Sequence, residues 1–150
     1  MALYRDLGFV YYWYIQDYKR AAECFLAGSK NPQSAHWMKT FAAELLAKGG
    51  SRENARFLWQ ELLDVSENEQ MKRNALENLL RLQALDEIDA LALFIRKVEA
   101  RTGRKWTSLS ELVSTGFLKQ IPLDPKGTPY ELDPETGEVR LSQDSTIRRF

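Results

Sequence analysis

The chain has 150 residues, of which 44% are hydrophobic and 28% are charged, and 21 basic and 21 acidic residues give a formal net charge of zero. This composition excludes wholesale disorder, and the charge balance excludes a long-range attraction to nucleic acid or anionic lipid. Because Cys24 and His36 are the only residues of their types, an intramolecular disulfide, a Cys/His zinc site within one chain and a histidine-dependent catalytic triad are excluded too.

The first four predicted helices cover residues 2–16, 18–29, 36–48 and 53–65. A motif in the second helix, Ala21-x3-Phe25, returns 34 residues later in the fourth as Ala55-x3-Trp59. A small residue four positions before a large aromatic lies on the same helix face, where a neighbouring helix can approach closely. The sequence therefore predicts two similar helix pairs stacked side by side.

A third, degenerate helix pair is predicted over residues 68–82 and 86–102. Ser66 and Glu69 have the spacing of a capping box that opens the first of these helices. Ala90 and Phe94 repeat the small-aromatic motif one residue late, and Thr102-Gly103 should end the second helix. We expect this last pair to cap the array.

The motif Tyr4-x2-Leu7-Gly8-x2-Tyr11, followed by Ala21-x3-Phe25 and Pro32, resembles the tetratricopeptide repeat (TPR), with Tyr4 in place of the usual tryptophan. The resemblance implies a mainly α fold, a short TPR-like α-solenoid of about three helix pairs. It also implies a concave face that is lined by the first helix of each pair and binds a protein segment.

The first helix is apolar on every side, whereas a surface helix normally has one apolar stripe. Leu3, Val10 and Tyr14 form one additional stripe, which either lacks a preceding helix or is a binding surface. Phe9, Tyr12 and Trp13 form another, which the TPR resemblance places toward the concave groove. For this second stripe we weigh a binding or self-association surface against simple core packing.

The carboxy-terminal part changes character after Gly103. Ser108 and Glu111 should cap a short helix that ends at Gly116, and two short strands at 128–132 and 138–141 should form a hairpin through the turn 133–137. A hairpin alone is marginally stable, so it should pack on the long helix through Tyr130, Leu132, Val139 and Leu141. We expect residues 143–150 to be a frayed tail.

The string Ile121-Pro122-x-Asp124-Pro125-x-Gly127-x-Pro129-Tyr130, followed by Asp133-Pro134-x-Thr136-Gly137-x-Val139, resembles the globular tail of major pseudopilins of type II secretion and of related type IV pilins. The resemblance covers about residues 88–142. It implies a helix with a hairpin packed on it. Many family members hold calcium just beyond the hairpin, but here the segment 142–145 offers too few oxygen ligands, so we expect no metal site.

These patterns predict residues 1–102 as TPR-like repeats, 86–142 as a pseudopilin-like element that shares the last repeat helix, and 143–150 as the tail. The leading hypothesis is a non-catalytic scaffold, not an enzyme, without cofactor or nucleic-acid partner, that binds a protein or peptide. Its predicted binding residues are Arg5, Phe9, Tyr12, Trp13, Thr40 and Glu44. The exposed aromatics of the first helix would also permit homo-oligomers.

The alternative hypothesis is a cell-envelope component that docks on a secretion or pilus apparatus through its pseudopilin-like tail. No stretch of the chain is long and apolar enough for a membrane span, so an anchor would have to lie upstream. An envelope location follows if the natural chain extends upstream of Met1 into such a stretch, and a cytoplasmic one follows otherwise.

Overall fold

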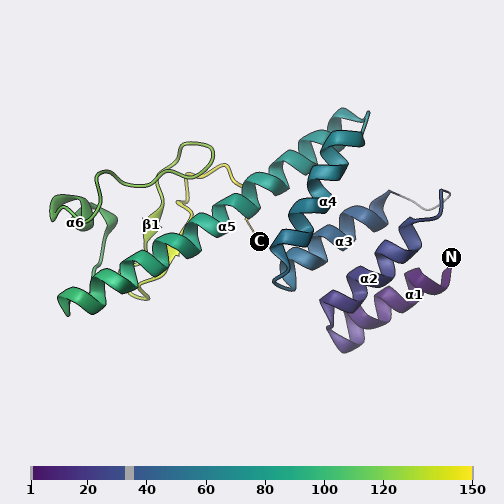
Figure 1. Ribbon diagram of the computed structural model, residues 1–150, viewed down its shortest axis with the longest axis horizontal. Coiled ribbons are helices and arrows are strands. Elements are labelled where there is room, and N and C mark those ends of the chain that lie inside the picture. The colour runs from purple at the N-terminus through teal and green to yellow at the C-terminus, as the bar shows by residue number, and fades with distance from the viewer. Residues whose placement is uncertain (1, 33–35, 150) are drawn as a thin grey trace. The chain divides into compact units, whose positions relative to one another are not determined.

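The computed structural model describes residues 2–32 and 36–149, which form two compact units, one within residues 1–79 and the other within 80–150. The fold is mainly helical and has a small antiparallel hairpin near its carboxy end (Figure 1). The fold class predicted from the sequence, a mainly α protein with a hairpin packed on the last long helix, is confirmed.

The first unit contains α1 (Ala2–Val10), the π-helical turn η1 (Tyr11–Ile15), α2 (Tyr18–Ser29), α3 (Trp37–Lys48), α4 (Arg52–Val65) and the beginning of α5. Helix α2 packs against both α1 and α3, and α3 packs against α4. The helices predicted at 18–29, 36–48 and 53–65 are therefore present within one residue at each end.

The small-aromatic motif does what its spacing predicts in the first two copies. Ala21, Phe25 and Ala55 are completely buried, and Trp59 is 1% exposed. At Gly8, a Cβ atom would lie 2.8 Å from Cζ of Phe25, so the backbones of α1 and α2 approach as closely as a glycine permits. Phe25 thus fills the space beside Gly8 of the neighbouring helix α1.

Helix α5 runs without interruption over 34 residues (Glu69–Thr102), so the predicted end near residue 82 and new start near 86 are wrong. The intervening sequence Leu82-Gln83-Ala84-Leu85 consists of good helix formers, and an acidic residue such as Asp86 does not break a helix. The third helix pair is therefore one long helix.

The start of α5 differs from the predicted capping box. The amide N–H of Met71 donates to Asn68 Oδ1 at 3.1 Å, and Ser66 Oγ accepts from the N–H of Asn68 at 3.2 Å. Asn68 therefore caps the helix, and Ser66 shapes the turn before it.

The third copy of the small-aromatic motif is not used like the first two. Ala90 is exposed, whereas Leu91, Ile95 and Val98, spaced by four and three residues, form the buried face of α5 in the second unit. This face packs against the short helix at 109–114 and the hairpin, and not against a second long helix of a repeat pair. Phe94 is only partly buried at the edge of that core.

The second unit packs α6 (Leu109–Ser114) and the strands β1 (Glu131–Leu132) and β2 (Val139–Arg140) against α5. The strands are antiparallel and pair Glu131 with Arg140 and Leu132 with Val139. The core contains the buried side chains Leu91, Ile95, Val98, Trp106, Leu109, Leu112, Tyr130, Leu132 and Val139, with Leu141 partly buried beside them.

The strands are shorter than the predicted 128–132 and 138–141, because the first of these segments pairs with the preceding loop instead. The N–H of Asp124 donates to Thr128 O at 2.7 Å, and that of Tyr130 donates to Pro122 O at 3.0 Å. The turn at 133–137 is present as predicted: Asp133 Oδ1 accepts from the N–H of Glu135, and Gly137 adopts a φ of 72°.

The prediction of a frayed tail is wrong for residues 143–149. Ile147 is 3% exposed, Ser145 Oγ donates to Asp124 Oδ2, and Arg149 Nη2 donates to Ser142 O at 2.7 Å. A polar sequence alone indicates little packing, but here the single apolar residue Ile147 and a buried carboxylate fix the segment. Phe150 lies outside the described residues.

Candidate functional site

The candidate site begins where α1 passes into the π-helical turn η1. The turn is closed by Gln16, whose φ of 57° is left-handed, and the N–H of Asp17 donates to Tyr11 O at 3.0 Å. Asp17 then caps α2 by accepting from the N–H of Arg20. Single π turns within helices occur frequently at functional sites, because they shift side chains off the regular helical face.

An open groove lies between α1 and α3 in the first unit. It is lined by Phe9 from α1 and by Trp37, Thr40, Phe41 and Glu44 from α3, and it encloses about 340 Å³. The three aromatic rings come from residues spaced by four on α3 and from one residue on α1. Helix packing alone therefore brings them together.

The aromatic rings of the groove form one packed cluster. Phe9 stacks on Trp37 with ring centroids 6.1 Å apart, and Phe41 lies 6.4 Å from both. The fully buried Phe25 contacts all three edge-on, at 5.0 to 5.7 Å. Such a base holds the groove rings in fixed positions, so the surface is preorganised.

Tyr12, a residue of the π turn η1, extends the aromatic cluster. Its ring meets Phe41 at 5.3 Å and Trp13 at 4.7 Å, both in edge-on geometry. Lys48 Nζ lies 4.6 Å from the centroid of the Tyr18 ring and 5.9 Å from that of Tyr12, which places a cation over the aromatic surface.

The structure brings together most of the predicted binding residues. Phe9, Thr40 and Glu44 line the groove, and Tyr12 contacts its wall. Trp13 touches Tyr12 and is 65% exposed, which places it beside the groove.

Arg5 stands apart from the other predicted residues. It forms an ion pair of 2.9 Å with its neighbour Asp6, and it is not among the lining residues of the groove. The groove residues Trp37 and Phe41 were not predicted. Their spacing to Thr40 and Glu44 on the same predicted helix was the signal that could have identified them.

The other apolar stripe of the first helix, formed by Leu3, Val10 and Tyr14, is exposed in the described part of the chain. Leu3 is 72% exposed, Val10 41% and Tyr14 84%. Leu7 and Tyr4 are also exposed, although a Cβ atom at Gly28 of α2 would lie 3.4 Å from Cβ of Tyr4. Gly8 is the buried residue of α1, and it faces Phe25 of α2.

Other side chains that could act as nucleophiles or acid–base groups have structural roles. Burial and the nearby charge of Glu23 raise the pKa of the Cys24 thiol, which favours its protonated form over the nucleophilic thiolate. Glu87 accepts a hydrogen bond of 2.5 Å from the hydroxyl of Tyr130. Asp133 serves the hairpin turn.

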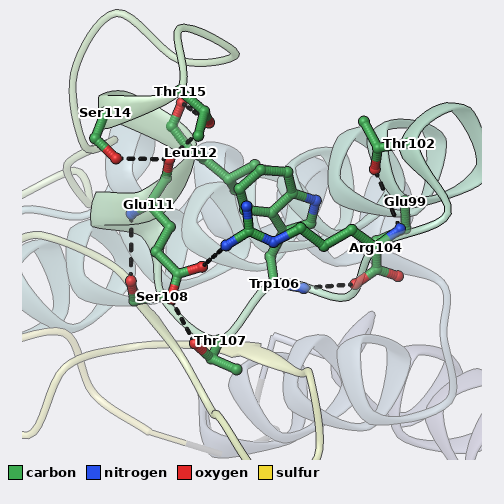
Figure 2. Close-up of polar contacts among 10 residues, drawn as sticks. All are labelled: Glu99, Thr102, Arg104, Trp106, Thr107, Ser108, Glu111, Leu112, Ser114 and Thr115. Carbon is green, nitrogen blue, oxygen red and sulfur yellow. Dashed lines mark hydrogen bonds and ion pairs between the residues drawn. The ribbon is translucent and has the colours of Figure 1, made fainter.

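The basic stretch at the end of α5 contains a structural network (Figure 2). The guanidinium of Arg104 lies 4.3 Å from the ring centroid of Trp106, and its Nη2 donates to Glu111 Oε2 at 2.9 Å. Thr107 Oγ1 donates to the other oxygen of Glu111 at 2.6 Å. Arg104 thus links the segment after α5 to α6. These contacts explain why an arginine stands at this position, and no ligand is needed to explain it.

Within residues 2–32 and 36–149, no three His, Cys, Asp or Glu side chains gather closely enough to hold a metal ion. No helix in that part of the chain is both long and apolar enough to cross a lipid bilayer. Comparison with known proteins gives no matching family model, no matching curated protein and no matching solved structure.

Proposed function

We propose that this protein is a non-catalytic scaffold that binds a segment of a partner protein in the groove between α1 and α3. The observation that carries the proposal is the preorganised aromatic surface of Phe9, Trp37 and Phe41 around an open space of about 340 Å³. Rigid aromatic anchors of this kind supply much of the binding energy at protein interfaces.

The shape and charge of the groove favour one class of partner. Its volume suits one or two apolar side chains, and Trp13 and Tyr12 continue the apolar surface past its end. Glu44 and Lys48 place one acidic and one basic group beside the aromatic rings. A short amphipathic segment with an apolar anchor flanked by charged residues fits these features, as in helix-in-groove recognition.

The test is selection of displayed 12-residue peptides on the full chain, followed by affinity measurements on variants. Trp13→Ala should weaken the selected peptides about tenfold, the effect of losing an aromatic anchor. Thr40→Trp should fill the groove and abolish binding. Tyr14→Ala is the matched control: Tyr14 neighbours Trp13 but is 84% exposed on the other stripe, and its loss should change affinity less than twofold.

Two results would contradict the proposal. Equal losses for Trp13→Ala and Tyr14→Ala would place binding on the stripe that contains Tyr14. Unchanged affinity in Thr40→Trp would remove the groove from the interaction. A large drop in melting temperature for Trp13→Ala would assign that residue to the core.

The hypothesis of a cell-envelope component stays a prediction that depends on the pseudopilin resemblance. Its test is the gene start: an in-frame upstream stretch of about 20 apolar residues would support it. A natural start at Met1 would favour a cytoplasmic adaptor.

A further inference from the structure

A separate cavity of about 300 Å³ lies in the second unit, between α5 and the hairpin. Leu85 and Ile88 of α5 form one apolar wall, and Val139 and Leu141 form the other. It is independent of the aromatic groove, all of whose residues belong to the first unit.

Three arginines, at positions 81, 140 and 149, line the same small cavity. Arg140 is held by acidic neighbours, since its Nη1 lies 2.8 Å from Asp133 Oδ2 and its Nε lies 3.6 Å from Glu131 Oε2. The positive charge of Arg140 is therefore largely balanced by these two carboxylates, and its side chain serves mainly as part of the cavity wall.

Arg149 differs from Arg140 in the partner that holds it. Its Nη2 donates to the carbonyl oxygen of Ser142 at 2.7 Å, a neutral acceptor that leaves the positive charge uncompensated by this contact. A guanidinium carries five N–H donors, so further donors remain to face a ligand. Arg81 adds a second guanidinium that is only 8% exposed and that also makes an interaction within the chain.

We propose that this cavity binds a small monocarboxylate with an apolar group, whose carboxylate is received by Arg149 with Arg81 nearby, and whose apolar part lies between Ile88 and Leu141. A guanidinium matches the planar geometry of a carboxylate and binds it through two parallel hydrogen bonds. The apolar walls reject a fully hydrated anion such as phosphate, because it would have to give up its water against side chains that cannot replace it.

Two sources offer this chemistry, namely a medium-chain fatty acid and the free carboxyl end of a peptide with an apolar last residue. The experiment therefore titrates the full chain with octanoate and with an acetylated tripeptide that ends in leucine. Octanol and the amide of the same tripeptide serve as uncharged controls. Binding is followed by calorimetry and by amide chemical shifts, which locate the ligand in the chain.

The expected result is saturable binding of at least one carboxylate, with shifts at residues 85–88 and 139–149, and about tenfold weaker binding of its uncharged control. Arg149→Gln should weaken the carboxylate about tenfold. Arg148→Gln changes the net charge equally one residue away, outside the cavity lining, and should change affinity less than twofold. Leu85→Trp, which fills the cavity without removing an arginine, should abolish binding even if Arg149→Gln disturbs the tail.

Three outcomes would overturn the proposal. These are absence of saturable binding by both carboxylates, equal effects of Arg148→Gln and Arg149→Gln, and chemical shifts confined to the aromatic groove of the first unit. Because the first unit is not involved, failure here leaves the proposed peptide groove untouched, and failure of the groove leaves this cavity untouched.

Discussion

At Gly8, the close approach of α1 to α2 leaves no room for a side chain. A methyl group there would lie 2.8 Å from Cζ of Phe25, which is fully buried and surrounded by Phe9, Trp37 and Phe41. Gly8→Ala should therefore destabilise the protein by about 1–2 kcal/mol, since overpacking outweighs the gain of about 1 kcal/mol in helix propensity.

Urea unfolding measures this change, and Gly28→Ala is its control. At Gly28 the nearest atom is Sδ of Met38 at 3.0 Å, on a flexible side chain that can move aside. We expect a smaller loss there. An increase in stability for Gly8→Ala would show that α1 can shift away from Phe25.

Asp124 is a buried carboxylate whose pKa is lowered in the folded protein. Burial alone would raise its pKa, but hydrogen bonds from the Ser145 hydroxyl and from the backbone N–H groups of Thr128, Lys126 and Gly127 outweigh burial. A lowered folded pKa means that the stabilisation is complete above the unfolded value of 3.8 and is lost as the pH falls through the folded value.

Ser145→Ala should consequently cost about 1.5–3 kcal/mol at pH 7, the range for a hydrogen bond to a charged group. The difference from the natural chain should shrink once the pH is below 3.8. Urea titrations at pH 7 and pH 3 measure both values, with the exposed neighbour Thr146→Ala as control. A difference that is the same at both pH values would mean that Ser145 acts through packing and not through the carboxylate.

At the scale of elements, α5 offers a matched pair of leucines. Leu91 is 8% exposed in the core of the second unit, whereas Leu93 is 49% exposed. Leu91→Ala should lower the free energy of unfolding by about 2–4 kcal/mol and Leu93→Ala by less than 1 kcal/mol. Thermal or urea unfolding distinguishes them, and equal losses would refute the assigned buried face.

How much of these elements the sequence predicts depends on whether local signals suffice. Asp17, Ser108 and Gly49 mark helix ends by local chemistry, and the predicted helices there are confirmed. The uninterrupted α5 was missed because the acidic residue Asp86 resembles a helix start, while a helix continues unless glycine or proline interrupts it. The exposed Ala90 was missed because its motif says nothing about which partner packs on it.

Only part of the candidate groove could be predicted from the sequence, because local patterns identify some of its residues and not others. Phe9 and Tyr12 stand out as surplus aromatics on a helix that needs only one apolar stripe. Trp37 and Phe41 lie on a helix whose sequence is only weakly amphipathic, so their role emerges only when α1 and α3 both pack against α2. The three-arginine cavity combines residues 68 positions apart and could not be read from any local pattern.

At the scale of the whole molecule, the division between the two units falls at residues 79 and 80, inside the continuous helix α5. A helix offers no extended segment to a protease, so we expect limited proteolysis to leave this region of α5 intact. We expect the segment 100–108 to resist as well, because Arg104 bonds Glu111 and Trp106 is buried. Because α5 runs through both units, we expect the two units to unfold together. Early cleavage between Ala100 and Ser108 that released a stable amino-terminal fragment would contradict this prediction.

Interrupting α5 should make the two units unfold in separate transitions. Gln83→Pro removes a backbone hydrogen bond in mid-helix and should cost about 3 kcal/mol. If continuity of α5 couples the units, this variant should unfold in two steps, whereas the control Gln83→Ala should unfold in one. Calorimetry decides between them, and a single transition in Gln83→Pro would mean that α5 is not what couples the units.

The four tryptophans are distributed so that each unit carries its own spectroscopic label. Trp13, Trp37 and Trp59 belong to the first unit, and Trp106 is the only one in residues 80–150. Trp106 is 4% exposed, its indole N–H has no acceptor among the described residues, and a guanidinium covers its ring. A chain grown with 5-fluorotryptophan would therefore give a fluorine resonance for the carboxy-terminal unit alone, and its disappearance on heating can be timed against the other three.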